Sequence, residues 1–336
     1  MRRRETPSSS LRSFTEAPAP TSRLEFAGAG FVGSHLALRL LAAGHEVRVL
    51  DDLSAGRNAA LLEGRGVELR VGDVADRHAV DAAVEGCEAV CHLAAVASVA
   101  ASVERPLETL GANLVGTVTV LEAAAAAGVL RFVYASSAAV YGRNQELPLR
   151  EDARPMPLSP YAADKLAGEH YLAHYHRTGA LSGHAFRFFN VYGPRQDPKS
   201  PYSGVISVFL DRAAAGRPLV VHGDGGQTRD FVYVADVVDV LARAAEGEGG
   251  ADDDPELPVT NVGRGESVSV LELAEAVAEA VGARPELEFG PPRAGDVRHS
   301  RADVTLLARR FGGVPATPLA AGLRATLGQY GRTTGR

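Results

Sequence analysis

The sequence is poor in sulfur-containing residues and has no tryptophan. Its 336 residues include two methionines and two cysteines, Cys87 and Cys91. A zinc site needs further Cys or His ligands at suitable spacing, and this pair lacks such companions. We therefore expect no metal site and two reduced thiols in or near a core, as is typical of a cytoplasmic protein.

Long apolar runs and an excess of positive charge are also missing. No uninterrupted apolar run reaches the ~18 residues of a membrane span, and the Arg-rich start lacks the apolar segment of a secretory signal. The formal net charge is -6, which argues against nucleic acid or an anionic membrane as the main partner. We expect a cytoplasmic protein that binds neither.

Two stretches are too polar to bury much surface. Residues 1–22 are rich in Ser, Pro, Thr and Arg and are predicted to form a disordered tail. Residues 246–257, "EGEGGADDDPEL", are predicted to be a surface loop. The rest of the chain carries the regular structure.

From Arg23 onwards, short β-branched runs alternate with alanine-rich helical stretches. The runs "HEVRVLDD", "VELRVGDV", "EAVCHLAA" and "LRFVYASS" predict strands, and a long helix is predicted to stop at Gly128. Strands separated by helices imply parallel pairing, so residues 23–188 predict a Rossmann-type, doubly wound α/β domain. Residues 189–336 are richer in Pro- and Gly-containing loops and predict a smaller C-terminal substrate-binding lobe, with some chain crossing between the two.

A glycine loop opens the first predicted helix. In "GAGFVGSH", Gly28, Gly30 and Gly33 satisfy G-x-G-x-x-G, the pattern that lets a backbone approach a pyrophosphate at a helix N-terminus. The next predicted strand ends in Asp51 and Asp52, and Asp51 follows Gly33 by 18 residues. A carboxylate there accepts hydrogen bonds from the adenosine ribose and repels a 2′-phosphate, which favours NAD over NADP.

A second group of residues suggests proton transfer. Ser136 and Ser137 end a predicted buried strand, where open α/β sheets bind their ligands. Tyr161 and Lys165 follow at helical i and i+4 spacing, which places them on one helix face. A nearby ammonium group and a cationic nicotinamide would lower the tyrosine pKa, so that the phenol can exchange protons with a hydroxyl group.

Taken together, these segments resemble the extended short-chain dehydrogenase/reductase family, and within it the UDP-glucose 4-epimerase-like nucleotide-sugar epimerases. The resemblance runs from about Arg23 to about Tyr330. Its landmarks in chain order are "GFVGSHL", "VLDDLSAGR", "GDV", "HLAA", "SSAAVYG", "SPYAADK", "RFFNVYGPRQ", "GDGGQTRDFVYVADVV", "NVGRGESVSV" and "PRAGDVRHSRAD".

The resemblance implies a site and a reaction. Ser137, Tyr161 and Lys165 would be catalytic, with Tyr161 as base and acid. The implied cofactor-binding residues are Gly28, Gly30, Phe31, Val32, Gly33, Asp51, Asp52, Asp73, Val74, Leu93, Ala94, Ala95, Tyr161, Lys165 and Phe189. The implied substrate-binding residues are Ser137, Tyr161, Asn190, Arg229, Arg293 and Asp296. The implied reaction is NAD-dependent 4-epimerisation of a UDP-hexose, with or without an N-acetyl group, by a homodimer that pairs through helices around 106–127 and 160–177.

The chain departs from the family pattern at its first strand and in the reactive helix. Phe26 and Ala27 replace the usual threonine and first glycine, and Glu25 adds a charge to a buried strand. The Ala27 methyl group is tolerable only if its φ angle is negative. Asp164 stands where serine is common, and we expect it to point outward.

Two other functions stay open at this point. A nucleotide-sugar 4,6-dehydratase, decarboxylase or ketoreductase shares much of the pattern. Ala138 and Ala139 follow Ser137 where dehydratases carry an acid pair, and Asn190 and Asp197 stand where enzymes of UDP-glucuronate carry threonine and arginine. A non-catalytic NAD-binding module is the other alternative, motivated by Ala27 and Glu25. A small residue at Ser300 would leave room for an N-acetyl group.

Overall fold

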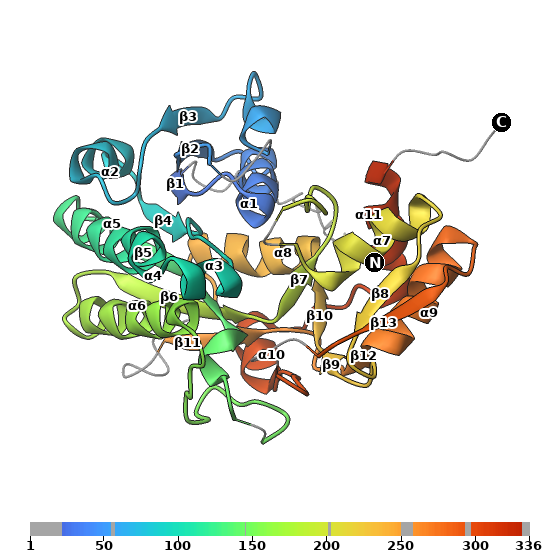
Figure 1. Cartoon of the computed structure of the whole chain (residues 1–336). Helices are drawn as coiled ribbons and strands as arrows, with labels where there is room; N and C mark the ends of the chain where they lie inside the picture. Colours follow the sequence, from blue (N-terminus) through green and yellow to red (C-terminus); the bar gives the residue numbers. More distant parts are fainter. Residues whose placement is uncertain are drawn as a thin grey trace, which may run out of the picture.

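The computed structural model describes residues 22–54, 58–144, 146–200, 203–249, 258–292 and 297–330. The predicted tail, apart from Ser22, and residues 250–257 of the predicted surface loop lie outside these ranges, as do Arg293 and Asp296. Two lobes make up the described chain, and the larger is built on a seven-stranded sheet (Figure 1).

All strand pairs in that sheet are parallel, in the order β11-β6-β5-β4-β1-β2-β3. The strands are β1 (Arg23–Ala27), β2 (Glu46–Asp51), β3 (Glu68–Val71), β4 (Ala89–His92), β5 (Arg131–Ser137), β6 (Ser182–Phe188) and β11 (Val259–Val262). Helices cover both faces, so the central strands are nearly continuous apolar runs. The predicted Rossmann-type fold is confirmed.

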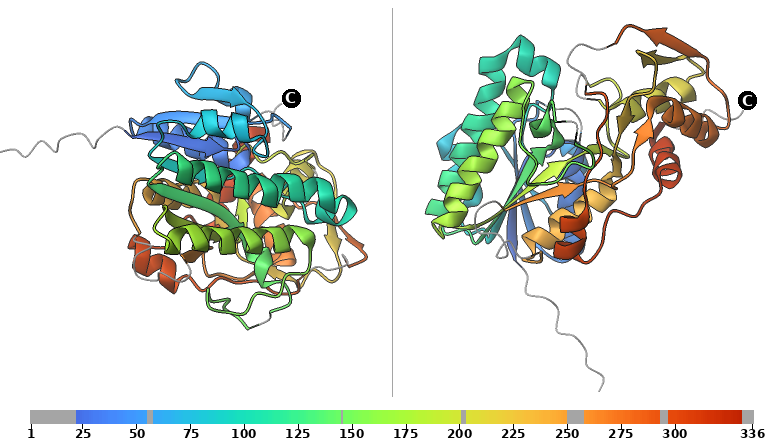
Figure 2. Two further views of the ribbon diagram at one scale, coloured as in Figure 1. Left: turned by 90° about the vertical axis from the view of Figure 1, so that its left-hand side faces the viewer. Right: turned by 90° about the horizontal axis from the view of Figure 1, so that it is seen from below.

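Two helical layers enclose the sheet (Figure 2). One apolar core joins one face to α1 (Phe31–Ala42), α8 (Val234–Ala245) and α10 (Thr305–Phe311). A second core joins the opposite face to α2 (Arg77–Val84), α5 (Gly116–Ala126) and α6 (Pro160–Arg177). Because β11 and α8 belong to the later half of the chain, that half also helps to build the larger lobe.

Three helical segments run on continuously into one apolar helix, Pro106–Ala126, made of α4 (Pro106–Leu110), the π-helical turn η2 (Gly111–Val115) and α5. Within the described residues, this helix is long and apolar enough to cross a membrane, with a mean hydropathy of 1.3, so the expectation that no such segment exists needs correction. This property is weak evidence for a membrane span, because core helices of globular proteins share it and 44% of the apolar stretch is buried. α3 (Val99–Glu104) precedes it.

The smaller lobe is a mixed structure with its own core. It contains α7 (Val205–Ala214), α9 (Val270–Val281), α11 (Leu319–Leu327) and three two-stranded sheets. These sheets pair β7 (Asn190–Tyr192) with β10 (Phe231–Tyr233), β9 (Thr228–Arg229) with β12 (Val268–Ser269), and β8 (Leu219–His222) with β13 (Leu287–Gly290). Short helical turns lie at η1 (Ala59–Leu62), η3 (Ala138–Tyr141) and η5 (Gly328–Tyr330).

The turn after β1 explains how the chain tolerates Ala27. Ala27 is the last residue of β1 and has a negative φ, and its methyl group is fully buried. The positive φ, +108°, falls on Gly28, where a Cβ atom would lie 2.8 Å from the Ala94 amide nitrogen. Gly28 therefore makes the close turn, and the alanine sits in ordinary strand conformation.

Glu25 is the more costly departure. It lies fully buried in β1 beside Arg48 of β2, and neither carboxyl oxygen has a hydrogen-bond partner within the described structure. Burial raises the pKa of Glu25 to about 8, although Arg48 and Arg70 oppose the rise. The carboxyl group is therefore largely protonated at neutral pH, because an ionised carboxylate here would be poorly solvated.

We predict that Glu25→Val stabilises the protein and does so more at higher pH. In the parent, the folded state keeps the Glu25 proton up to about pH 8, whereas the unfolded chain loses it near 4.5, the ordinary pKa of a glutamate side chain. Folding then binds a proton across this window, so the free energy of unfolding falls by about 1.4 kcal/mol per pH unit as pH rises. Chemical denaturation at pH 5, 7 and 8.5 should show this slope in the parent and a flatter one in Glu25→Val.

Glu25→Gln is the matched control, because it removes the titration and keeps the size and polarity. It should flatten the pH dependence without the full gain in stability. Equal slopes in all three proteins would contradict the buried, protonated carboxyl group.

Candidate active site

The predicted site residues follow the carboxyl ends of adjacent strands. Gly28 follows β1, Leu93 follows β4, Ser137 ends β5 and Phe189 follows β6. In a parallel sheet these ends lie along one edge, which is where doubly wound folds bind their ligands. Sequence segments more than 160 residues apart are brought together in this way.

The glycine loop has the shape that a dinucleotide requires. A Cβ atom at Gly33 would lie 1.9 Å from the Gly28 carbonyl oxygen, so Gly33 lets α1 pack against the turn. A Cβ atom at Gly30 would meet nothing within 4 Å. The protein itself thus gives no steric reason for glycine at 30, and the open space fits the approach of a pyrophosphate group.

The acid at the end of β2 supports this loop. Asp51 accepts hydrogen bonds from the Ala29 amide at 2.5 Å and from the Leu53 amide at 2.7 Å, so its carboxylate lies beside the glycine loop as predicted for a ribose ligand. Asp52 instead accepts bonds from Ser54 in an exposed turn. The geometry therefore favours Asp51 over Asp52 for the ribose.

The other predicted cofactor residues surround the same edge. Phe31 and Val32 form the first turn of α1, whose amide groups lack intrahelical acceptors. Asp73 and Val74 follow β3. Val74 is buried against Gly116 of α5, where a Cβ atom would lie 2.6 Å from its side chain. Further residues that border the edge are Ala94, Ala95 and Phe189.

The reactive residues meet between β5 and α6. Ser159 caps α6 by accepting the Ala162 amide, and Pro160 occupies the first turn, so the helix begins one residue before Tyr161. The Ser137 hydroxyl group lies near enough to the Tyr161 phenol to lower its pKa, and Ser137 Oγ accepts from the Ala139 amide at 3.2 Å. Lys165 donates from Nζ to the Ala135 carbonyl oxygen at 2.8 Å. The predicted grouping of serine, tyrosine and lysine is therefore present in the structure.

Burial dominates the acid–base behaviour of this group. Burial raises the pKa of Tyr161, and the nearby Ser137 hydroxyl group partly offsets that rise. The lowered tyrosine pKa predicted from the sequence is thus not produced by the protein alone. Burial also lowers the pKa of Lys165 to about 8, against the opposing charges of Asp164 and Glu169.

Asp164 does not point outward as expected. Its side chain is 6% exposed, because α6 turns this position towards η2 rather than towards solvent. Burial raises the pKa of Asp164, a hydrogen bond to Asn113 opposes the rise, and one carboxyl oxygen has no partner within the described residues. The i+3 spacing from Tyr161 already placed Asp164 near the buried face of the helix, and this signal was missed.

Sequence reasoning also missed a buried ion pair behind the serines. Glu169 of α6 and Arg187 of β6 are both almost fully buried. Arg187 donates from Nε and Nη2 to the two Glu169 oxygens at 2.9 and 2.7 Å. A lone arginine within the apolar run "HAFRFF", and a glutamate one helical turn after Lys165, were the available signals.

Two of the predicted substrate residues, Asn190 and Arg229, belong to the smaller lobe. Asn190 is exposed at the start of β7, and Arg229 is half-buried, with Nη1 2.8 Å from the Thr228 carbonyl oxygen. Between them in space, the fully buried Asp230 accepts hydrogen bonds from the amides of Arg264, Gly265 and Ala302. Asp230, which the sequence did not single out, thus fixes the loops beside Arg229.

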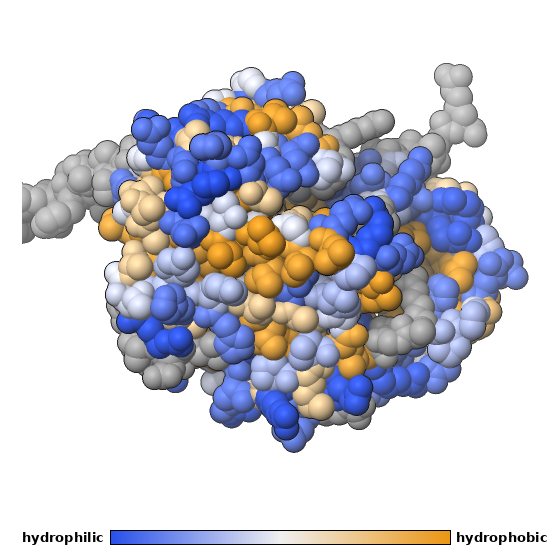
Figure 3. Space-filling view, turned by 60° about the vertical axis from the view of Figure 1, so that its left-hand side comes forward, coloured by the Kyte–Doolittle hydropathy of each residue, from blue (hydrophilic) through white to orange (hydrophobic). Residues whose placement is uncertain are grey.

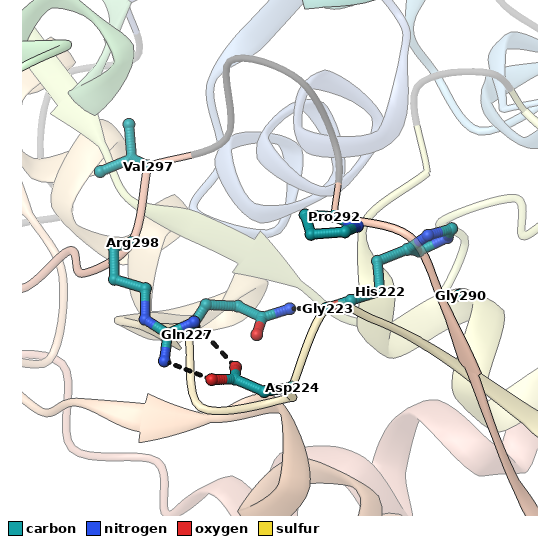
Figure 4. Close-up of a pocket in the computed structure, with 8 residues that line it drawn as sticks. All are labelled: His222, Gly223, Asp224, Gln227, Gly290, Pro292, Val297 and Arg298. Carbon is teal, nitrogen blue, oxygen red and sulfur yellow. Dashed lines mark hydrogen bonds and ion pairs between the residues drawn. The ribbon is translucent and has the colours of Figure 1, made fainter.

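A cavity of about 540 Å³ opens in the smaller lobe (Figure 4). It lies where the parallel strands β8 and β13 end, at His222 and Gly290. Across it, Arg298 donates to both Asp224 oxygens at 2.8 Å. The lining residues are His222, Gly223, Asp224, Gln227, Gly290, Pro292, Val297 and Arg298.

The fold and the glycine loop define a Rossmann-type dinucleotide-binding enzyme. Residues 27–263 match the family described as "NAD dependent epimerase/dehydratase family". The chain belongs to this family, and the predicted NAD cofactor and enzymatic nature are confirmed.

Individual relatives narrow the likeness. The chain is 43% identical over 304 residues to a UDP-glucose 4-epimerase of Mycolicibacterium smegmatis, covering 89% of this chain and 95% of that protein. A Thermus thermophilus UDP-glucose 4-epimerase in complex with NAD superimposes with a TM-score of 0.83, at 38% identity over 93% of this chain and 99% of that one. A Thermotoga maritima UDP-glucose 4-epimerase with UDP-glucose gives 0.85, at 34% identity over 92% and 98%. An NDP-hexosamine 5,6-dehydratase and UDP-glucuronic acid decarboxylases also match.

The contrast between two glycines gives a test of the cofactor site. We predict that Gly30→Ala leaves the melting temperature of the nucleotide-free protein unchanged but weakens NAD binding at least tenfold, because the added methyl group occupies only the space left for the pyrophosphate. Gly28→Ala should lower the melting temperature itself, since it combines strain at positive φ with a backbone clash. Thermal unfolding and calorimetric titration with NAD measure both. Unaltered NAD affinity in Gly30→Ala would refute this placement of the pyrophosphate.

Proposed function

We propose that this protein catalyses NAD-dependent 4-epimerisation of a UDP-hexose through a transient 4-keto sugar. The observation that carries the proposal is the meeting of Ser137, Tyr161 and Lys165 at the strand edge that also holds the glycine loop. The likeness to UDP-glucose 4-epimerases over most of the chain supports it.

The residues suit a reversible removal of hydrogen from C4. Tyr161 takes the proton of the 4-hydroxyl group, Ser137 hydrogen-bonds to the same oxygen, and Lys165 favours the phenolate through its positive charge. NAD supplies the hydride acceptor and donor, so the reaction is redox-neutral overall. The keto sugar then presents its other face, and Tyr161 returns the proton. The hexose must therefore be held loosely while the nucleotide is held firmly.

The cavity at the ends of β8 and β13 suits the nucleotide. Its volume of about 540 Å³ lies within the range of small-molecule sites. An imidazole ring, a proline and a guanidinium group border it, a mixture that can accept a base, a ribose and negative charge. Pro292 and Val297 also flank the segment that carries Arg293 and Asp296, the predicted diphosphate and ribose ligands.

The lyase alternative is less well supported at the strand end. Elimination of water needs an acid beside the reacting carbon, and Ala138 and Ala139 follow Ser137 in η3. The side chains at the end of β5 therefore suit a 4-epimerase better than a dehydratase.

We predict that Tyr161→Phe lowers turnover by about 10²- to 10⁴-fold, the usual contribution of a positioned acid–base group. NAD binding should change little. The assay follows anomeric protons by NMR in mixtures of UDP-galactose and UDP-N-acetylgalactosamine, with and without added NAD. The appearance of gluco epimers identifies the reaction and shows which sugars fit.

Three outcomes would count against the proposal. Near-parental turnover in Tyr161→Phe would remove the tyrosine from proton transfer. Net release of NADH or loss of water would indicate one of the other nucleotide-sugar enzymes. NAD binding with no conversion of any sugar would favour the non-catalytic module.

We also propose that the protein is a homodimer through the outer face of helices α3 to α6. Figure 3 shows an apolar patch across the middle of this face. The exposed apolar side chains there are Val99, Val103, Leu107, Val115 and Tyr171. A contiguous apolar patch of this kind marks an interaction site.

We predict that Leu107→Asp converts the dimer to a monomer, because Leu107 is 83% exposed within the patch and a buried aspartate would be unpaired. Leu130→Asp is the matched control. Leu130 is 57% exposed, but it lies directly before β5, at the amino end of that strand, and is not one of the patch residues. Sedimentation equilibrium measures both. A parent that sediments as a monomer, or a control that dissociates equally, would reject this face.

A further inference from the structure

Three consecutive residues at the end of β5 each face a different residue of α6. The Ala135 carbonyl oxygen accepts from Lys165 Nζ at 2.8 Å. Ser136 Oγ donates to Glu169 Oε1 at 2.5 Å, and the Ser137 hydroxyl group lies beside the Tyr161 phenol, whose pKa it lowers. The middle contact is the one that the proposed reaction does not use, and it lies between the two that it does use.

The acceptor in that middle contact is held from the other side. Arg187 pairs with Glu169 through two hydrogen bonds. It also donates from Nη1 to the Glu151 carbonyl oxygen at 3.0 Å, and its guanidinium lies 4.7 Å from the centre of the Tyr141 ring. Glu169 therefore cannot turn away from Ser136 without leaving a buried arginine unpaired.

We propose that Glu169 and Arg187 are positioning residues that clamp Ser136, and thereby hold Ser137 against Tyr161 and the Ala135 carbonyl oxygen against Lys165. The assignment rests on the proposed function, because the serine, tyrosine and lysine matter as a unit only if they move a proton together. Neither residue of the pair touches the substrate in this scheme. A loss of 1 Å in alignment at the reacting hydroxyl group is enough to slow such chemistry a hundredfold.

Stability alone is a poor account of this ion pair. Moving two charges out of water costs much of the free energy that their attraction gains. Apolar residues of similar volume often stabilise a folded protein as well as such a pair, or better. The pair instead supplies a directional acceptor at a fixed place. The short bond to Ser136 uses one Glu169 oxygen, and Arg187 orients both oxygens in one plane.

The pair also contributes to the field around Lys165. Asp164 and Glu169 both oppose the burial that lowers the pKa of Lys165 to about 8. In a Glu169→Gln variant, the neutral amide oxygen would still accept a hydrogen bond from Ser136. The negative charge of Glu169 near Lys165 would be lost. The ionisable groups that face Lys165 or its contacts are Tyr161, Asp164 and Glu169 of α6, His92 of β4, Tyr134 of β5 and Arg187 of β6.

The decisive variant is Ser136→Ala, which removes one hydroxyl group and leaves the ion pair in place. We expect kcat to fall 10- to 100-fold with KM and NAD affinity little changed. Ser207→Ala is the matched control, because Ser207 is an equally buried serine with one backbone hydrogen bond, to Gly204, in the smaller lobe. It should retain parental kcat.

A second measurement does not depend on turnover. In protein labelled with ¹³C at tyrosine Cζ, NMR follows the titration of Tyr161. The Tyr161 signal is assigned because it is absent from the spectrum of Tyr161→Phe. The nearby Ser137 hydroxyl group lowers the pKa of Tyr161, so Ser136→Ala should move this titration to higher pH, whereas Ser207→Ala should leave it unchanged. If the parent epimerises no sugar but this shift is seen, the proposed function fails and the positioning role stands.

Glu169→Gln separates alignment from charge. We expect it to retain at least tenfold more kcat than Glu169→Ala, because the amide oxygen still accepts from Ser136. The alkaline limb of its pH–rate profile should move to lower pH, because Lys165 loses a counter-charge and sheds its proton more easily. Parental kcat and an unmoved Tyr161 titration in Ser136→Ala, in a parent that epimerises, would overturn the positioning role.

Discussion

The contact between the end of β5 and one face of α6 is the interaction on which the site depends. A parallel sheet brings strand ends to one edge, but it does not set the register between a strand end and the helix beside it. Here the i, i+4, i+8 spacing of Tyr161, Lys165 and Glu169 meets three successive residues of the strand. Two of these contacts, from Lys165 to the Ala135 carbonyl oxygen and from Ser136 to Glu169, are hydrogen bonds that join the helix face to the extended strand.

This locking explains how the chain tolerates irregularity in its first strand. β1 contributes the glycine turn but none of the reactive side chains. The turn is held by Gly28, by the close packing of Gly33 and by the hydrogen bond from Ala29 to Asp51. A buried Glu25 therefore costs stability without displacing the loop. β1 departs from the expected pattern at Glu25, Phe26 and Ala27, and none of these three residues is among the reactive ones.

Much of the larger lobe could be predicted from the sequence, because periodicity and turn residues report on local structure. The order of strands and helices up to β6, the stop at Gly128 and the grouping of Ser137 with Tyr161 and Lys165 all followed from spacing. The direction of Asp164 and the pairing of Glu169 with Arg187 did not. Both depend on which side chains lie across from a helix face in three dimensions, and no local pattern encodes that. The loops around Asp230 were hidden for the same reason, since its three amide donors come from two distant segments.

The path of the chain between the lobes supplies the last constraint. β11 comes from the later half of the chain and pairs with β6, so that this half is hydrogen-bonded to the edge of the seven-stranded sheet. Asn261 of β11 accepts from the Tyr141 hydroxyl at 2.6 Å and donates to the Leu149 carbonyl oxygen at 2.9 Å. Tyr141 in turn lies under Arg187. The network that aligns the reactive tyrosine therefore continues into the strand that carries the second lobe. A link of this kind would suit the epimerisation proposed above, in which the nucleotide stays fixed while the sugar turns.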